Sequence, residues 1–154
     1  MKRIVAWAWM LVGMLGACSE RGGPALKDGE RLDLALLIPA ESTQGLRHAA
    51  ADLAEAAAII TKAPEPAAVV CDAAELGEAG LVVAVELVAE QGLGPEDYRI
   101  GKIGDKSRYG GREGLVVQAA SSVGAMYGLY KIAGDLGVEY LHPEQTFFPE
   151  DESA

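Results

Sequence analysis

The segment from Gly114 to Pro143 constrains the fold of this chain more than any other part of it. It begins with the apolar run Leu115–Ala119, which is typical of a strand, and continues into Ser121–Leu136, where apolar residues recur at three- and four-residue steps. A serine at the start can cap this helix, and Gly137 stands where a left-handed residue commonly ends one. Val138–Leu141 then predicts a second short strand. This order of elements favours a fold in which helices pack on a sheet.

Three glycines interrupt the predicted helix, at Gly124, Gly128 and Gly134. Each lowers the helix propensity by about 1 kcal/mol relative to alanine. A helix retains such residues most readily where another element packs closely against its backbone. We therefore expect the sheet or another helix to lie against all three glycines.

The preceding hundred or so residues show the same two periods. The segment Ser42–Lys62 carries small and apolar residues on one helical face and is followed by a proline, which predicts a helix. Tyr98–Ile103 alternates apolar and polar residues and predicts an antiparallel strand pairing with Leu115–Ala119 across the polar hairpin connection Gly104–Gly114. Further strands are predicted at Leu32–Ile38, Ala67–Cys71 and Leu81–Leu87. The fold class is α/β (α+β), a mixed sheet of about five or six strands with two helices on one face.

The N-terminus has the pattern of an export signal. Lys2 and Arg3 precede the apolar run Ile4–Met14, which is too short to cross a bilayer, where about 20 residues are needed. Small residues then lead directly to Cys18, as in a bacterial lipoprotein signal; the alternative is an ordinary signal peptide followed by a chance cysteine. We expect residues 1–17 to be removed, Cys18 to be lipidated, and the polar residues 18–31 to tether the protein to the bacterial cell envelope, at the outer membrane or cell surface.

The charge of the chain limits its partners. The formal net charge is −10, and removal of the two cations in residues 1–17 makes it −12 (−10 minus 2). A protein with this much negative charge is repelled by nucleic acid and by anionic lipid. We therefore expect the lipid anchor to make the only contact with the membrane. The last residues, 150–154, form an acidic tail.

No catalytic or metal-binding pattern is evident in the sequence. The acidic pairs, such as Glu96 with Asp97, lie in a predicted turn or in the C-terminal tail, where solvated charges are common. His48 and His142 fall on different elements without ligand spacing, and His48 should face solvent. Cys71 lies in an apolar run, which favours a buried structural thiol. We expect no cofactor and no metal.

Three motifs carry a family resemblance. The first two are Gly94–Ile100 (GPEDYRI) and Gly114–Ala120 (GLVVQAA). The third is Gly124–Ala133 (GAMYGLYKIA) followed by Leu136–Pro143 (LGVEYLHP). In this order and spacing the chain resembles the small α/β domain that precedes the catalytic barrel in α-glucuronidases, β-N-acetylhexosaminidases and related glycoside hydrolases. The resemblance covers about residues 32–149.

The resemblance implies a non-catalytic domain, because the catalytic carboxylates of those enzymes lie on the barrel. The chain stops at Ala154, roughly where a barrel would begin. We expect either an accessory domain that works with a barrel in cis or in trans, or a stand-alone lipoprotein that binds a glycan or a partner protein. Aromatic faces and arginine donors suit carbohydrate. The candidate glycan contacts are Tyr98, Arg99, Tyr109 and Arg112, with Tyr127, Tyr130 and Tyr140 as further aromatic candidates.

Overall fold

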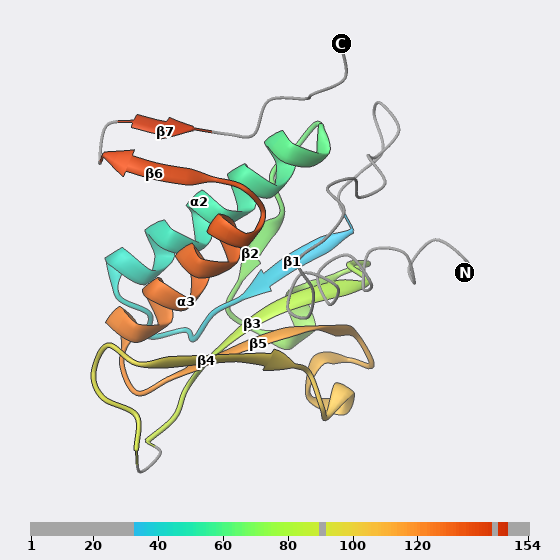
Figure 1. The fold of residues 1–154 in the computed structure, drawn as a ribbon. Helices are drawn as coiled ribbons and strands as arrows, with labels where there is room; N and C mark the ends of the chain where they lie inside the picture. The colour runs from blue at the N-terminus through green and yellow to red at the C-terminus, as the bar shows by residue number, and fades with distance from the viewer. Residues whose placement is uncertain (1–32, 90–91, 143–144, 148–154) are drawn as a thin grey trace.

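The computed structural model describes residues 33–89, 92–142 and 145–147. It has the expected α/β fold, a five-stranded mixed sheet with two helices side by side on one face (Figure 1). The predicted signal peptide, the lipidation site Cys18, the tether and the acidic tail lie outside the described residues.

The sheet has the strand order β2-β1-β3-β5-β4. Four strands are parallel, and β4 pairs antiparallel with β5 at one edge, as the alternation in its sequence predicts. The strands are β1 (Leu34–Leu37), β2 (Ala68–Val70), β3 (Leu81–Leu87), β4 (Tyr98–Lys102) and β5 (Glu113–Ala119). The predicted last strand is β6 (Glu139–His142), which pairs with β7 (Gln145–Phe147) in a separate two-stranded sheet.

Both long helices begin at a side-chain cap. Thr43 accepts a hydrogen bond from the backbone N–H of Leu46 at the start of α2 (Gln44–Thr61). Ser121 accepts from Val123 and Gly124 at the start of α3 (Ser122–Asp135). Each cap satisfies backbone donors that a helix leaves unpaired in its first turn, which is why both helices start where the sequence predicts.

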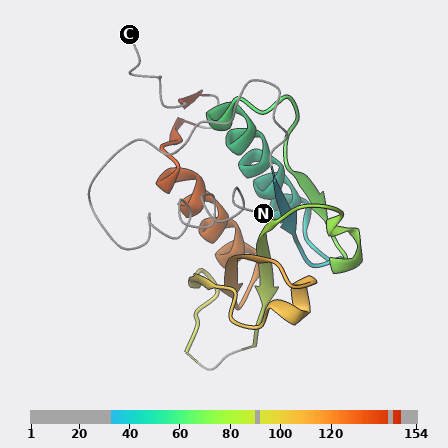
Figure 2. The same ribbon diagram turned by 90° about the vertical axis from the view of Figure 1, so that its right-hand side faces the viewer.

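The two faces of the sheet are covered differently. On the helix face, α2 and α3 bury a continuous core that includes Leu36, Val83 and Val117. The opposite face, called here the second face, buries a smaller cluster around Val82, and its cover comes from two short 3-10 turns. These are η1 (Ala73–Leu76) and η2 (Lys106–Tyr109), which lie across the sheet from the helices (Figure 2).

Two of the three glycines in α3 sit where we expected a close neighbour. A Cβ at Gly124 would lie 2.4 Å from the carbonyl oxygen of Asp97, and one at Gly128 would lie 2.4 Å from Val117 Cγ1. Gly134 differs, since a Cβ there would meet nothing within 4 Å. The expectation for Gly134 was wrong, because this position near the end of α3 projects away from both the sheet and α2.

Candidate functional site

Polar side chains interrupt the apolar strands at one place on the second face. Glu86 is the only charged residue of β3, and its register partner on β5 is Gln118, the only side-chain amide of that strand. Gln118 is in turn the register partner of Arg99 on β4. The three residues therefore form a row across neighbouring strands on one face, at the carboxyl ends of β3 and β5. In an open α/β sheet, ligands commonly bind at this end of the parallel strands.

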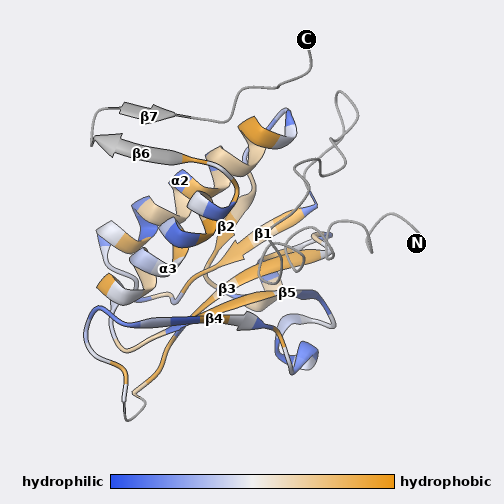
Figure 3. Cartoon of the chain, viewed as in Figure 1, coloured by the Kyte–Doolittle hydropathy of each residue, from blue (hydrophilic) through white to orange (hydrophobic). Residues whose placement is uncertain are grey.

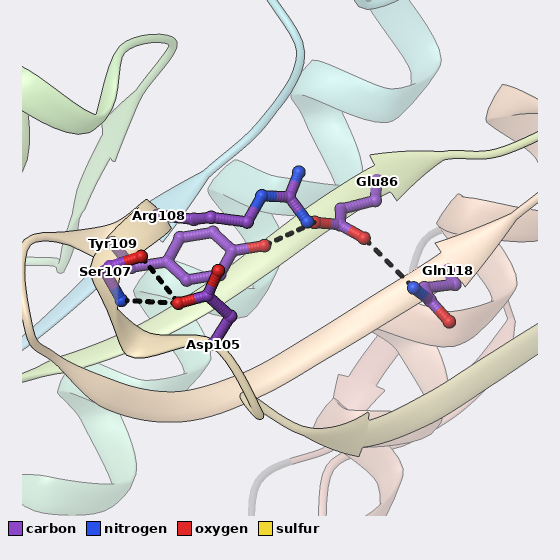
Figure 4. A network of polar contacts seen from close by, with 6 residues as sticks. All are labelled: Glu86, Asp105, Ser107, Arg108, Tyr109 and Gln118. Carbon is purple, nitrogen blue, oxygen red and sulfur yellow. Dashed lines mark hydrogen bonds and ion pairs between the residues drawn. The ribbon is translucent and has the colours of Figure 1, made fainter.

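Glu86 is the centre of a polar network (Figure 4). Its Oε1 accepts a hydrogen bond from the hydroxyl of Tyr109 at 2.5 Å and lies 2.6 Å from Nη1 of Arg108. Its Oε2 accepts from Nε2 of Gln118 at 3.0 Å. Each carboxylate oxygen thus has a donor, and two of the three donors come from η2.

Burial and pairing act in opposite directions on this carboxyl group. Desolvation raises the pKa of Glu86, but the hydrogen bonds from Gln118 and Tyr109 and the charge of Arg108 lower it more, so the pKa lies below its ordinary value of 4.5. The Tyr109 hydroxyl is affected the other way. Its burial, its hydrogen bond to Glu86 and the negative charge of Glu86 raise the pKa of Tyr109 to about 12.

The turn that carries Tyr109 is fixed locally by its own sequence. Asp105 caps η2 by accepting hydrogen bonds from the backbone N–H and the hydroxyl of Ser107, at 3.0 and 2.6 Å. These bonds lower the pKa of Asp105. At the other end of the turn, Gly110 adopts the left-handed conformation with φ 62°. The connection that the sequence predicts only as a polar hairpin loop is therefore an ordered turn that delivers an aromatic ring to the sheet.

The network attaches η2 to β3 and β5 and stabilises the ionised form of Glu86. It is therefore unsuited to proton transfer. Glu86 has a lowered pKa and is ionised at neutral pH, so it cannot serve as the raised-pKa acid that glycoside hydrolysis requires. Within the described ranges, no three His, Cys, Asp or Glu side chains gather in a way that could hold a metal ion. His48 lies elsewhere, on the outer side of α2, 3.8 Å from Asp52, with its side chain 76% exposed.

The structure separates the four residues that sequence reasoning proposed for glycan contact. Arg99 is exposed on the second face, next to Gln118. Tyr109 is buried, and only its hydroxyl takes part in the network. Tyr98 is half-buried on the helix face against Gly128. Arg112 donates to the backbone carbonyls of Gly77, Ala79 and Tyr109, and so clamps η2 to the segment that follows η1.

Sequence reasoning missed the residues that organise this place. Glu86, Gln118 and Arg108 were not among its candidates. A signal was present, since Glu86 interrupts the run LVVAVEL and Gln118 interrupts GLVVQA, each as a single polar residue near the end of a buried strand. A polar residue that must enter a core needs partners, so such interruptions mark places where other elements supply hydrogen bonds.

Cys71 also differs from expectation. Its thiol is only half-buried, and Nη1 of Arg47 lies 3.8 Å from the sulfur. The sequence neighbours of Cys71 include no basic residue, but α2 brings one to it from 24 positions away. Spacing along the chain could not show this contact.

No protein-family model matches the chain, and a search of curated proteins finds no relative. Among the residues with described positions, no helix has both the length and the apolar character needed to cross a membrane.

Proposed function

We propose that this protein is a non-catalytic accessory domain of a lipid-anchored glycoside hydrolase-like protein at the bacterial cell envelope. It would work beside a catalytic barrel that belongs to the same protein or to a partner, and it would need no cofactor of its own. Lipidation of Cys18 would hold it at the membrane.

One observation carries the proposal: the first two motifs that resemble the glycosidase domain, and the helical part of the third, pack on one another. The first motif enters β4, the second covers all of β5 except Glu113, and these two strands pair directly. The helical part of the third lies in α3, whose Gly124 approaches the backbone of Asp97 and whose Gly128 approaches Val117. Residues that pack on one another can account for the likeness through the fold alone, without an active site. This supports an accessory domain over an enzyme.

The chemistry around Glu86 agrees with a non-catalytic role. A glycosidase holds two carboxyl groups at a defined separation, one of them able to give up a proton. Glu86 pairs with Arg108 and accepts a hydrogen bond from Gln118, and its pKa is lowered, which is the opposite of what a general acid needs. We therefore expect the purified 154-residue chain to leave aryl glycosides intact.

The first test is the intact mass of the native protein, extracted from the membranes of its own bacterium. A mass larger by a barrel, or a barrel-bearing partner that stays bound through purification, would support the proposal. The mass of the lipidated chain alone, with no such partner, would contradict it, and turnover of an aryl glycoside by the purified chain would contradict the non-catalytic role.

The anchor has its own test. The variant Cys18→Ser should leave the membrane fraction, because it loses the thiol that carries the lipid. The matched variant Cys71→Ser, which changes a cysteine inside the folded domain, should remain with the membrane. A Cys18→Ser protein that stays membrane-bound would refute the lipoprotein anchor.

A second candidate function is a stand-alone lipoprotein that binds a glycan or a partner protein. It is favoured by the two exposed arginines Arg99 and Arg108 near β4 and η2, which an accessory domain serving only as a spacer does not require.

A further inference from the structure

The positive charge of this acidic protein is concentrated in one segment. Residues 98–112 carry five of the 13 lysines and arginines and a single acidic residue, Asp105, for a net charge of +4 along the sequence (5 minus 1). The rest of the chain then carries −14 (−10 minus 4). In the fold, Glu113 pairs with Lys106 and Glu86 pairs with Arg108, so the local excess of positive charge is smaller than the sequence count. The segment comprises β4, η2 and their connection, which stand out as polar against the apolar inner strands (Figure 3).

Two of these arginines flank the polar row on the second face. Arg99 stands beside Gln118 on the edge strand, and Arg108 reaches Glu86 from η2. Three adjacent strands carry the row Arg99, Gln118, Glu86, so it extends over two strand spacings, or about 10 Å. Both arginine side chains face the side of the sheet that the helices leave open.

The network around Glu86 holds Arg108 in place. One terminal nitrogen of the guanidinium binds Oε1 of Glu86, and the guanidinium carbon lies 5.7 Å from the centre of the Tyr109 ring. The Arg108 side chain is nevertheless 61% exposed, so further N–H groups of the fork remain open to solvent. An arginine already fixed by a carboxylate and an aromatic ring loses less conformational entropy when it binds a ligand.

The row also offers a hydrogen-bond acceptor. Gln118 donates from its amide nitrogen to Glu86, and its carbonyl oxygen can act as an acceptor. A ligand that matches this row needs anionic groups for the arginines and a hydroxyl or another donor for the amide oxygen. Sugar hydroxyls both donate and accept, and a carboxylate pairs with the guanidinium fork. An acidic polypeptide supplies carboxylates and backbone N–H donors but no hydroxyl groups, so polyglutamate is the comparison that tests this choice.

We propose that the second face, at Arg99, Arg108 and Gln118, binds a glycan that carries carboxylate groups. Glu86 and Tyr109 act as positioning residues for Arg108. The inference rests on the proposed function only in that export places the domain among envelope or extracellular glycans.

The probe is polygalacturonate, and neutral dextran and polyglutamate are the comparison polymers. Calorimetry measures the affinity of the full chain for each polymer in a neutral detergent. We expect the protein to bind polygalacturonate, to bind it less tightly as salt is added, and not to bind dextran. Arg99→Gln and Arg108→Gln should each weaken binding by about tenfold, the effect of losing one charge-assisted hydrogen bond. Arg99→Gln leaves the bonds to Glu86 in place, so its effect cannot be attributed to a displaced η2.

The matched control is Lys131→Gln, which removes the same charge from the exposed surface of α3. Its affinity should stay within about twofold of the unaltered protein, since charges separated by more than a Debye length are largely screened. Equal loss in Lys131→Gln, equal affinity for polyglutamate, or no binding to polygalacturonate would each overturn the proposal. None of these results bears on the intact mass or on glycoside turnover, so this inference and the proposed accessory role can fail separately.

Discussion

The contact between α3 and β4 makes a quantitative prediction about Gly124→Ala. The new Cβ would lie 2.4 Å from the carbonyl oxygen of Asp97, 3.2 Å from its carbon and 3.3 Å from the Cβ of Ala119. The obstructing atoms at Asp97 are backbone, so no side chain can rotate away and the helix must shift. Overpacking of this kind costs about 1–3 kcal/mol. Alanine recovers about 1 kcal/mol of helix propensity. Since the clash is with backbone, we take the upper end and expect a net loss of about 2 kcal/mol.

Gly134→Ala in the same helix is the matched control. A Cβ at Gly134 would meet nothing within 4 Å, so the substitution should gain up to about 1 kcal/mol from helix propensity alone. The two variants should therefore differ by about 3 kcal/mol, with opposite signs relative to the unaltered protein.

Urea unfolding measures this difference through the midpoint, provided that the slope m is unchanged. For a domain of this size, each kcal/mol corresponds to about 4 °C, so Gly124→Ala should melt about 8 °C lower and Gly134→Ala a few degrees higher. Equal stability of the two variants would mean that α3 does not lie against the backbone of Asp97, directly before β4. The packing of the motifs, on which the proposed function rests, would then be refuted.

Further predictions concern the network around Glu86. Tyr109→Phe should lower the stability by about 1–2 kcal/mol, because a buried hydroxyl bound to a carboxylate is lost, whereas Tyr127→Phe at the exposed surface should change it by less than about 0.5 kcal/mol. In an absorbance titration at about pH 11, the Tyr109 phenol should remain protonated while exposed tyrosines ionise, because its pKa is raised to about 12; loss of all tyrosine protons together would refute this. Folding lowers the pKa of Glu86, so its contribution is complete above the unfolded pKa and is lost as the pH falls through the folded one. Urea midpoints measured from pH 6 down to 3 should thus fall less in Glu86→Gln than in the unaltered protein, and parallel curves would contradict the assignment. Arg112→Gln should destabilise by about 1–3 kcal/mol through its three backbone carbonyl partners, with a smaller effect on polygalacturonate binding than Arg99→Gln; the reverse order would make Arg112 a ligand contact.

Much of the fold follows from local sequence patterns. The helix predicted at Ser42–Lys62 is α2, Gln44–Thr61, and the strand predicted at Leu81–Leu87 is β3 with the same bounds. These elements are predictable because hydrophobic period and capping residues act within a few positions of one another. The antiparallel pairing of β4 with β5 was also predictable, because the alternation of β4 indicates a strand exposed on one side.

The candidate site was not predictable in the same way. Arg99 was proposed from its residue type and is exposed on the second face, but Tyr98, only one position earlier, points to the helix face. Alternation along a strand places neighbours on opposite sides, so the two could not share one surface. Arg112 looked available in sequence and is occupied by the carbonyls of distant residues.

The sequence alone therefore determined where the two long helices and the five strands of the main sheet form, and that both helices have a single apolar face. It could not tell Gly124 and Gly128, which have close neighbours, from Gly134, which has none within 4 Å. Only the tertiary structure decided that β5 lies between β3 and β4, which sets Glu86, Gln118 and Arg99 in one row. It also decided that η2 folds back to bring Arg108 and Tyr109 to Glu86 from more than twenty residues away. The physical reason is that secondary structure depends on interactions between near neighbours, whereas a site depends on which distant segments share a face once the strands have paired.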